Sequence, residues 1–121
     1  MAINESYNIA ICVVAYDRLE AIACLLQSLQ VAHYSEKVDL IISVDKSYTS
    51  AVEDYADNYQ WEYGEKYVVK HKENLGLRRH ILSVGEYTQK YDAIVVLEDD
   101  LIVGPNFYNY TLATVDRKSV V

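Results

Sequence analysis

The feature that most constrains the fold is a set of four short, β-branched apolar segments that recur along the chain. They occupy residues 8–15, 38–45, 66–71 and 92–99, and most of their residues are apolar. Continuous apolar runs of this length are typical of strands that are covered on both faces, as in a parallel sheet. The segment KYVVKH at 66–71 is more polar, and it is therefore expected at an edge of the sheet.

Amphipathic helical patterns follow the first two of these segments. Over residues 18–32, apolar side chains recur on one helical face and polar side chains on the other. Asp17 and Glu20 have the spacing of a capping box at the start of this helix. Ser50 and Glu53 have the same spacing ahead of a shorter helix. We therefore expect a helix after each of the first two strands.

Two further helices complete the pattern. One is expected over residues 77–91. Another is expected from Pro105, because proline suits the first helical turn and Gly104 lets the chain bend into it. Strands and helices then alternate along the chain. This alternation predicts an α/β fold with right-handed crossovers and a mostly parallel sheet between helical layers.

The length and charge of the chain limit the range of functions it can have. At 121 residues, it is expected to form one domain, residues 1–121. Its 11 Lys and Arg against 18 Asp and Glu give a net charge of −7, which argues against nucleic-acid binding. No apolar run reaches the roughly 20 residues of a membrane span, and the N-terminus lacks the pattern of a secretory signal, so a cytoplasmic location is expected. Cys12 and Cys24 lie in apolar segments and are expected to be buried thiols.

Charged residues follow all four predicted strands. Ligands of parallel sheets bind at the carboxyl ends of the strands, so the sequences AYDR, VDKS, HKENLGLRRH and LEDDL predict a shared pocket. Glu98, Asp99 and Asp100 would repel one another there unless a divalent ion such as Mg²⁺ or Mn²⁺ compensates. Because successive residues of an extended strand point to opposite sides, Glu98 and Asp100 should face one way and Asp99 the other. At most two of the three should then share one ligand.

Each candidate also has a purely structural interpretation. The residues that could serve only as caps, turn formers or solvated surface charges are Asp17, Arg18, Asp45, Asp99 and Asp100. His80 could be a half-buried structural histidine. Arg78 and Arg79, at the start of the third predicted helix, suit a phosphate or a polar base but could equally balance the acidic surface. Tyr55, Tyr59 and Trp61 have near-helical spacing and are expected to pack rather than to bind a sugar.

Four segments carry a family resemblance. In this order, IAICVVAYDR, LIISVD, NLGLRRH and IVVLEDDLIVGPNFYNY resemble the nucleotide-sugar-binding half of GT-A-fold glycosyltransferases. The likeness is to enzymes related to N-acetylglucosaminyltransferase I and to the family 2 glycosyltransferases, and it covers about residues 8–115. It implies a Rossmann-like fold and a nucleotide-sugar donor, with a UDP-sugar expected.

The resemblance implies distinct roles for the three acids of LEDD. Asp100 matches the last acid of the metal motif, which binds Mn²⁺ or Mg²⁺. Asp99 matches an acid that reaches toward the ribose, and Glu98 matches one near the hydroxyls of the donor sugar. These last two assignments can be interchanged. A bound metal would stabilise the charge of the departing nucleoside diphosphate.

Three further residues acquire roles from the same likeness. Asp45 matches the acid that accepts a hydrogen bond from the uracil ring, and Arg18 matches an arginine that contacts the nucleotide. His80 falls where a base-contacting histidine would lie, if a gap of a few residues is allowed before the fourth strand. Together with the metal-motif acids, these residues form the predicted donor site.

The expected second half of such an enzyme is not found in this sequence. Members of the family continue well beyond the metal motif, and that part supplies the acceptor surface and, in inverting enzymes, the catalytic base. Asp116 is the one carboxylate after Asp100. We therefore expect a truncated, N-terminal half of a longer enzyme, whose glycan, lipid or protein acceptor and stereochemistry the sequence leaves open. Self-association through exposed apolar surface is a further expectation.

Three functions are compatible with these sequence features. The leading hypothesis is a glycosyltransferase donor domain that binds a nucleotide sugar and a divalent metal. The alternative is a catalytically inactive fragment, or a non-catalytic module of the same fold that binds a nucleotide or a protein. A metal-dependent phosphotransfer or phosphoacceptor domain ranks last, because such domains carry their acids after the first strand, whereas the triplet here follows the fourth.

Overall fold

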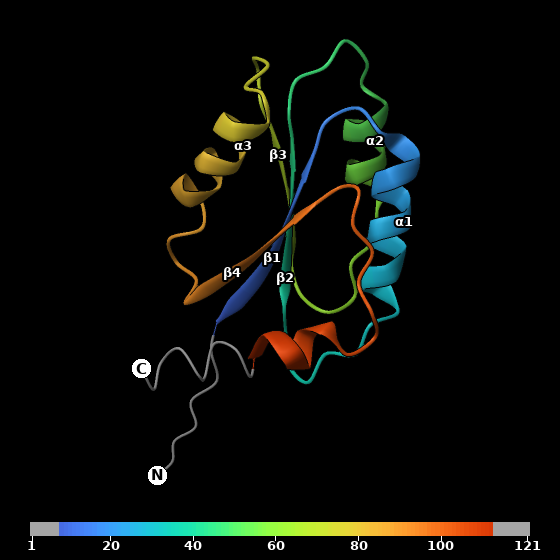
Figure 1. Cartoon of the computed structure of the whole chain (residues 1–121), viewed down its shortest axis with the longest axis vertical. Coiled ribbons are helices and arrows are strands. Elements are labelled where there is room, and N and C mark those ends of the chain that lie inside the picture. The colour runs from blue at the N-terminus through green and yellow to red at the C-terminus, as the bar shows by residue number, and fades with distance from the viewer. Residues whose placement is uncertain (1–7, 113–121) are drawn as a thin grey trace.

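The protein has one parallel sheet of four strands between helices (Figure 1). The computed structural model describes residues 8–112. The strands follow one another in space in the order β3-β2-β1-β4, and all neighbours are parallel. Their bounds are β1 Ile9–Ala15, β2 Asp39–Val44, β3 Lys66–Lys70 and β4 Ala93–Glu98. The predicted alternation, the parallel sheet and the edge position of KYVVKH are confirmed.

Helices cover both faces of the sheet. Helices α1 and α2 lie on one face and α3 lies on the other, as Figure 1 shows. Their bounds are α1 Leu19–Gln30, α2 Ala51–Asn58 and α3 Leu77–Ser83, and α3 continues into a 3-10 turn, η1 Val84–Glu86. Residues 107–112 are also helical. No helix within residues 8–112 has the length and apolarity needed to cross a membrane.

The central strand β1 divides the apolar interior into two parts. All seven of its residues are buried, because it is flanked by strands on both sides and by helices on both faces. Its alternate residues Ile9, Ile11 and Val13 pack against α1 and α2, whereas Cys12 and Val14 face α3. This two-sided burial explains why the strand reads as a continuous apolar run rather than as an alternating one.

Two elements differ from the sequence-based prediction. The third helix ends at Ser83 instead of extending to residue 91, and η1 and turns lead into β4. Thr88 Oγ1 donates to the Val84 carbonyl at 2.8 Å, and the Tyr91 N–H donates to Thr88, so this segment is tied by turn hydrogen bonds. Gly85 lies where the helix changes to 3-10 geometry, and glycine is a poor helix former. The predicted fourth helix has a turn at residues 105–106 and helical geometry from 107.

The predicted capping boxes do not form. Arg18 rather than Asp17 is the N-cap residue of α1, and it makes no capping hydrogen bond through its side chain. Ser50 is the N-cap residue of α2, but its hydroxyl donates to Asp54 at 3.1 Å. The capping-box spacing therefore predicted where both helices begin, but the capping hydrogen bonds that it implies are not formed.

The cysteine prediction is correct for one residue only. Cys12 is buried in the sheet, whereas Cys24 is exposed. The buried residues of α1 are Ile22, Leu25, Leu26 and Leu29. This spacing leaves Cys24 on the solvent side of the helix.

Tyrosine hydroxyls satisfy carbonyls at the end of α1. The last four carbonyls of a helix have no i+4 partner within the helix, and two of them here, those of Leu29 and Gln30, accept phenol hydroxyls, as does the carbonyl of Leu26 one turn earlier. The bonds run from Tyr59 to Leu26 at 2.8 Å, from Tyr34 to Leu29 at 2.7 Å and from Tyr63 to Gln30 at 2.7 Å. Tyr55, Tyr59 and Trp61 pack against the larger core, so their predicted packing role is confirmed.

Candidate functional site

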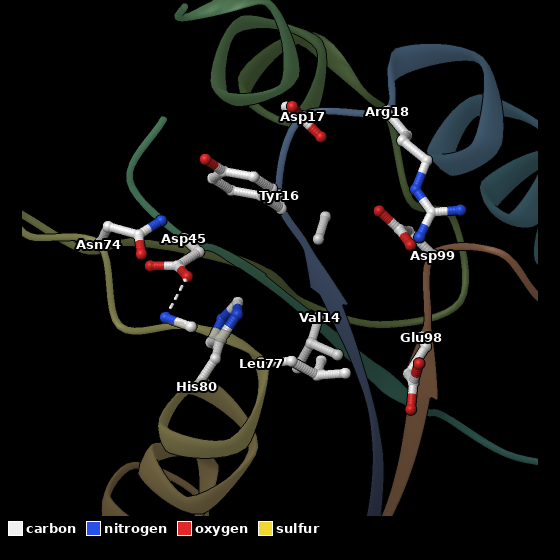
Figure 2. Close-up of a pocket in the computed structure, with 12 residues that line it drawn as sticks. Val14, Tyr16, Asp17, Arg18, Asp45, Asn74, Leu77, His80, Glu98 and Asp99 are labelled. Atoms are coloured by element: carbon white, nitrogen blue, oxygen red, sulfur yellow. Dashed lines mark hydrogen bonds between the residues drawn. The ribbon is translucent and has the colours of Figure 1, made fainter. Parts of the chain in front are cut away.

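A pocket lies at the carboxyl ends of the strands, where the sequence predicts one. Its volume is about 330 Å³, and Figure 2 shows its residues. Three strand ends and the start of α3 supply the lining, because parallel strands deliver their carboxyl ends to one edge. The lining residues are Val14, Ala15, Tyr16, Asp17, Arg18, Asp45, Asn74, Gly76, Leu77, His80, Glu98 and Asp99.

Asp45, directly after β2, holds the loop that leads into α3. Its side chain is 3% exposed. Oδ1 accepts the backbone N–H groups of Lys46 at 2.9 Å and Leu75 at 2.8 Å, and Oδ2 accepts that of Gly76 at 2.9 Å. A carboxylate has about four acceptor positions, so Oδ2 can accept one more hydrogen bond. Asp45 therefore fixes the pocket wall and also retains capacity for a ligand donor.

Asp99 is a buried carboxylate beside an arginine. It is 6% exposed, and burial raises its pKa above the ordinary aspartate value. The Arg18 guanidinium and a backbone hydrogen bond from Tyr16 act in the opposite direction and lower the pKa of this carboxyl. Figure 2 shows the guanidinium of Arg18 next to Asp99, with Arg18 carried by the chain after β1 and Asp99 by the chain after β4. The two strand ends thus present opposite charges to each other across the pocket.

The acidic triplet is arranged differently from the strand-based expectation. Glu98 and Asp99 line the pocket, whereas Asp100 is exposed and is not part of the lining. The reason is that β4 ends at Glu98, and the Leu101 N–H turns back to the Glu98 carbonyl at 3.1 Å. Side chains in a turn do not alternate as they do in a strand, so the expected pairing of Glu98 with Asp100 is wrong. Two of the three acids still share one cavity.

His80 is deeply buried rather than half-buried. It is 2% exposed and lies on α3, with its Nε2 atom 2.8 Å from the hydroxyl of Ser43. Burial, and secondarily the neighbouring His71, lower the pKa of His80 below the ordinary histidine value, while Asp45 opposes this shift. The ring is therefore held preferentially neutral.

Tyr16, Asn74 and Gly76 are among the lining residues that were not predicted site residues. Tyr16 belongs to the AYDR segment and is 39% exposed, and Figure 2 shows its ring in the pocket. Asn74 donates to the Lys46 carbonyl at 2.9 Å, and Gly76 has a φ of 79°, a conformation that favours glycine. The NLG sequence could have indicated such a turn. The AYDR segment was expected at the pocket, but its charged residues rather than Tyr16 were taken as the candidates.

The two arginines of NLGLRR do not line this pocket. Arg78 and Arg79 are both exposed, and Arg79 lines a separate cavity on the other side of α3. The lining side chains therefore carry four carboxylates against the single guanidinium of Arg18. An anionic ligand entering this pocket would need a cation to compensate these charges.

The described residues contain no preformed multidentate metal site. Within residues 8–112, no group of three or more His, Cys, Asp or Glu side chains is arranged to hold a metal ion. Asp116, the remaining carboxylate after the triplet, lies outside the described residues. Any metal at this pocket would thus have to take further ligands from a bound substrate or from water.

Comparisons with known structures support the fold. The crystal structure of S. aureus TarS 1–349 superposes with a TM-score of 0.65 and 15% sequence identity, over 91% of this chain and 32% of that one. The crystal structure of the same TarS fragment in complex with UDP gives the same values, and the one in complex with UDP-GlcNAc gives 16% identity over 31% of its length. The present chain therefore spans about a third of these TarS chains.

Sequence comparison identifies the family. A search of curated protein sequences found no match. The family model described as glycosyl transferase family 2 matches residues 10–121, which is nearly the whole chain. The GT-A-type fold seen in the structural comparison and the pocket at the strand ends agree with this match. The chain belongs to glycosyl transferase family 2.

Proposed function

We propose that this chain is a glycosyltransferase donor domain that binds a nucleotide sugar, a UDP-sugar in the first instance, in the pocket at the strand ends. The observation that carries the proposal is that segments distant in sequence bring Arg18, Asp45, His80, Glu98 and Asp99 into one cavity. TarS, which shares the fold, has been crystallised with UDP and with UDP-GlcNAc. We treat residues 1–121 as one such domain in this proposal.

The pocket offers suitable chemistry for each part of the donor. The free acceptor position of Asp45 suits a ring N–H of uracil, and the ring of Tyr16 offers a face for stacking. Arg18 suits a nucleotide oxygen. Asp99 and Glu98 suit ribose and sugar hydroxyls, as acceptors of their O–H groups.

A divalent metal ion, Mn²⁺ or Mg²⁺, completes the proposal. Asp100 would hold it, because its carboxylate is exposed directly beside Glu98 and Asp99 and is accessible to a hydrated ion. Ions of this kind often use one or two carboxylates together with substrate phosphates, so they do not require a three-residue cluster. When bound, the ion would act as a Lewis acid on the diphosphate. The donor set present thus fits the ion.

Calorimetry with UDP and UDP-GlcNAc, with and without Mn²⁺, tests the proposal. We expect metal-dependent binding that Asp100→Ala weakens at least about tenfold, since a ligand to the metal is lost. Glu62→Ala is the matched control, because Glu62 is also an exposed acid but precedes β3, at the opposite end of the sheet. Equal binding by both variants would remove Asp100 from the metal site.

The alternative from the sequence is a catalytically inactive or non-catalytic module. Absence of heat with either nucleotide, with or without metal, would favour that alternative over the donor domain. Transfer to a glycan, lipid or protein acceptor needs a separate assay, because the similarity to TarS 1–349 covers only 32% of that chain. A cytoplasmic location stays a prediction.

Self-association is proposed on separate grounds. Val96 on β4, at an edge of the described sheet, is 40% exposed, and Leu101 and Ile102 are 44% and 71% exposed. Light scattering over a range of concentrations should detect dimers. A constant monomer mass would contradict this part of the proposal.

A further inference from the structure

The buried hydroxyl of Ser43 contacts three other side chains beneath the pocket. Ser43, the fifth of the six β2 residues, is fully buried. Its Oγ lies 2.8 Å from His80 Nε2, 3.1 Å from His71 Nε2 and 2.7 Å from the Tyr87 hydroxyl. His71 follows β3, His80 lies on α3 and Tyr87 follows η1, so the hydroxyl connects three separate segments. The proposed function assigns no role to Ser43, His71 or Tyr87.

The chemistry of a hydroxyl limits how these bonds are arranged. A serine hydroxyl donates one hydrogen bond and accepts two. If all three contacts are hydrogen bonds, one partner accepts the proton of Ser43 and the other two donate to its oxygen. The acceptor must therefore be either a ring nitrogen without a proton or the phenol oxygen of Tyr87.

His80 is the best acceptor among the three partners. It is 2% exposed, whereas His71 is more exposed and lines the cavity on the other side of α3. Burial and His71 both lower the pKa of His80, which keeps this ring neutral and leaves one of its nitrogens without a proton. Tyr87 can donate its own phenol proton to Ser43. In this arrangement every group has a complementary partner.

We propose that Ser43 is a positioning residue of the donor pocket, which donates its proton to His80 Nε2 and so fixes the histidine as the tautomer with its proton on Nδ1. Nε2 is then occupied by the Ser43 hydroxyl, and the ring proton lies on Nδ1. His80 can therefore offer the pocket only an N–H donor. A change of tautomer would reverse this property without moving the ring.

The consequence for the ligand rests on the proposed function. Figure 2 shows His80 close to Asp45, and Asp45 Oδ2 retains an acceptor position. In the proposed binding mode Asp45 accepts the ring N–H of uracil, and the donor beside it matches the neighbouring carbonyl oxygen. In the same position cytosine has an unprotonated ring nitrogen facing Asp45 and an amino group facing His80, so neither hydrogen bond can form. With the base held in this position, the Ser43 network would help the pocket to prefer uridine over cytidine nucleotides.

The tautomer is measurable without any ligand. Two-dimensional ¹H–¹⁵N NMR of the imidazole nitrogens, near pH 8 where exposed rings are neutral, distinguishes the two forms. The chain has three histidines, and the exposed His33 provides an internal reference for an unconstrained ring. We expect His80 in the Nδ1–H form and His33 mainly in the Nε2–H form that free imidazoles prefer. His80 found as Nε2–H in the wild-type protein would overturn the proposal, and this result needs no variant.

Two substitutions then separate positioning from simple packing. Ser43→Ala should return His80 to the Nε2–H form, and Ser43→Thr, which keeps a hydroxyl, should restore Nδ1–H. In calorimetry, Ser43→Ala should lose about three- to tenfold in preference for UDP over CDP, the effect of one hydrogen bond, with Ser43→Thr close to wild type. A preference that Ser43→Ala leaves unchanged would contradict the role in base selection. If the wild type binds neither nucleotide, the proposed function fails while the tautomer measurement still decides the role of Ser43.

Discussion

Replacing Asp45 with asparagine separates its two roles, as a support of the pocket wall and as a ligand acceptor. The carboxylate accepts three backbone N–H groups, from Lys46, Leu75 and Gly76, at 2.8 to 2.9 Å. An asparagine keeps one oxygen, which can still serve Lys46 and Leu75. Its NH₂ group then faces the N–H of Gly76, and two donors cannot bond to each other.

The expected loss of stability follows from these contacts. Hydrogen bonds to a charged group contribute about 1.5 to 3 kcal/mol, and a buried donor left without a partner costs about 1 to 3 kcal/mol. Because the Gly76 bond is only partly buried, we expect Asp45→Asn to lower the free energy of unfolding by about 2 kcal/mol. For a domain of this size, that loss corresponds to a fall in Tm of roughly 8 °C.

Asp39→Asn is the matched control at the other end of β2. Asp39 Oδ1 accepts the Glu65 N–H at 2.9 Å, and Oδ2 accepts the Tyr91 hydroxyl at 2.8 Å. Here an NH₂ group can donate to the phenol oxygen instead, so the cost should stay below about 1 kcal/mol. Urea denaturation of the two variants measures the difference, and calorimetry measures UDP binding. If Asp45→Asn is no less stable than Asp39→Asn, the assignment of Asp45 as the anchor of the 74–76 loop is refuted.

Three other predictions concern stability. Gly64→Ala should destabilise the protein strongly, because an added Cβ would lie 2.3 Å from the Val38 carbonyl oxygen, whereas Gly85→Ala, with no atom within 4 Å, should be nearly neutral in thermal denaturation. Tyr63→Phe should cost about 1 kcal/mol in urea denaturation, since it leaves a carbonyl at the end of α1 without its phenol donor, and an unchanged midpoint would contradict that role. The pKa of His80 is lowered in the folded protein, so the unfolded chain binds a proton more readily than the folded chain does. The stability contributed by the neutral ring is therefore present at neutral pH. It is lost as the pH falls below about 6.5, the ordinary histidine pKa. The stability difference between wild type and His80→Asn should therefore shrink between pH 7 and pH 5, and a constant difference would contradict the burial argument.

The backbone arrangement was largely predictable because the dominant signal was local. The first two strands and their helices are fixed by continuous apolar runs and by the spacing of residues such as Ile22 and Leu26, which each segment carries in itself. The end of α3 was not predictable in the same way. It depends on turn hydrogen bonds such as that of Thr88 and on the contact of Tyr87 with Ser43, across the fold.

The sequence predicted which residues line the pocket better than it predicted how their side chains are oriented. The sequence places charged residues after each predicted strand. Five of the predicted site residues do line one pocket: Arg18, Asp45, His80, Glu98 and Asp99. The orientation of the acidic triplet depends on the residue at which β4 stops, because side chains beyond that residue no longer alternate between the two faces of the sheet. The Ser43 network could not be predicted from the sequence, because the hydrogen-bond partners of a lone serine in an apolar strand come from three segments that meet only in the folded chain.

The position of β4 at the edge of the described sheet has a consequence for amide exchange. β1 is paired on both sides, whereas β4 is paired to β1 alone within residues 8–112, and its side chains are less buried. Edge elements of this kind open locally at lower free energy than the centre, so the amides of β4 should exchange with solvent before those of β1. A donor held between Arg18 and Asp99 would join the ends of these two strands, and it would slow that exchange in proportion to its occupancy. Occupation of the pocket would then be visible as protection of an entire strand, well beyond the residues that touch the ligand.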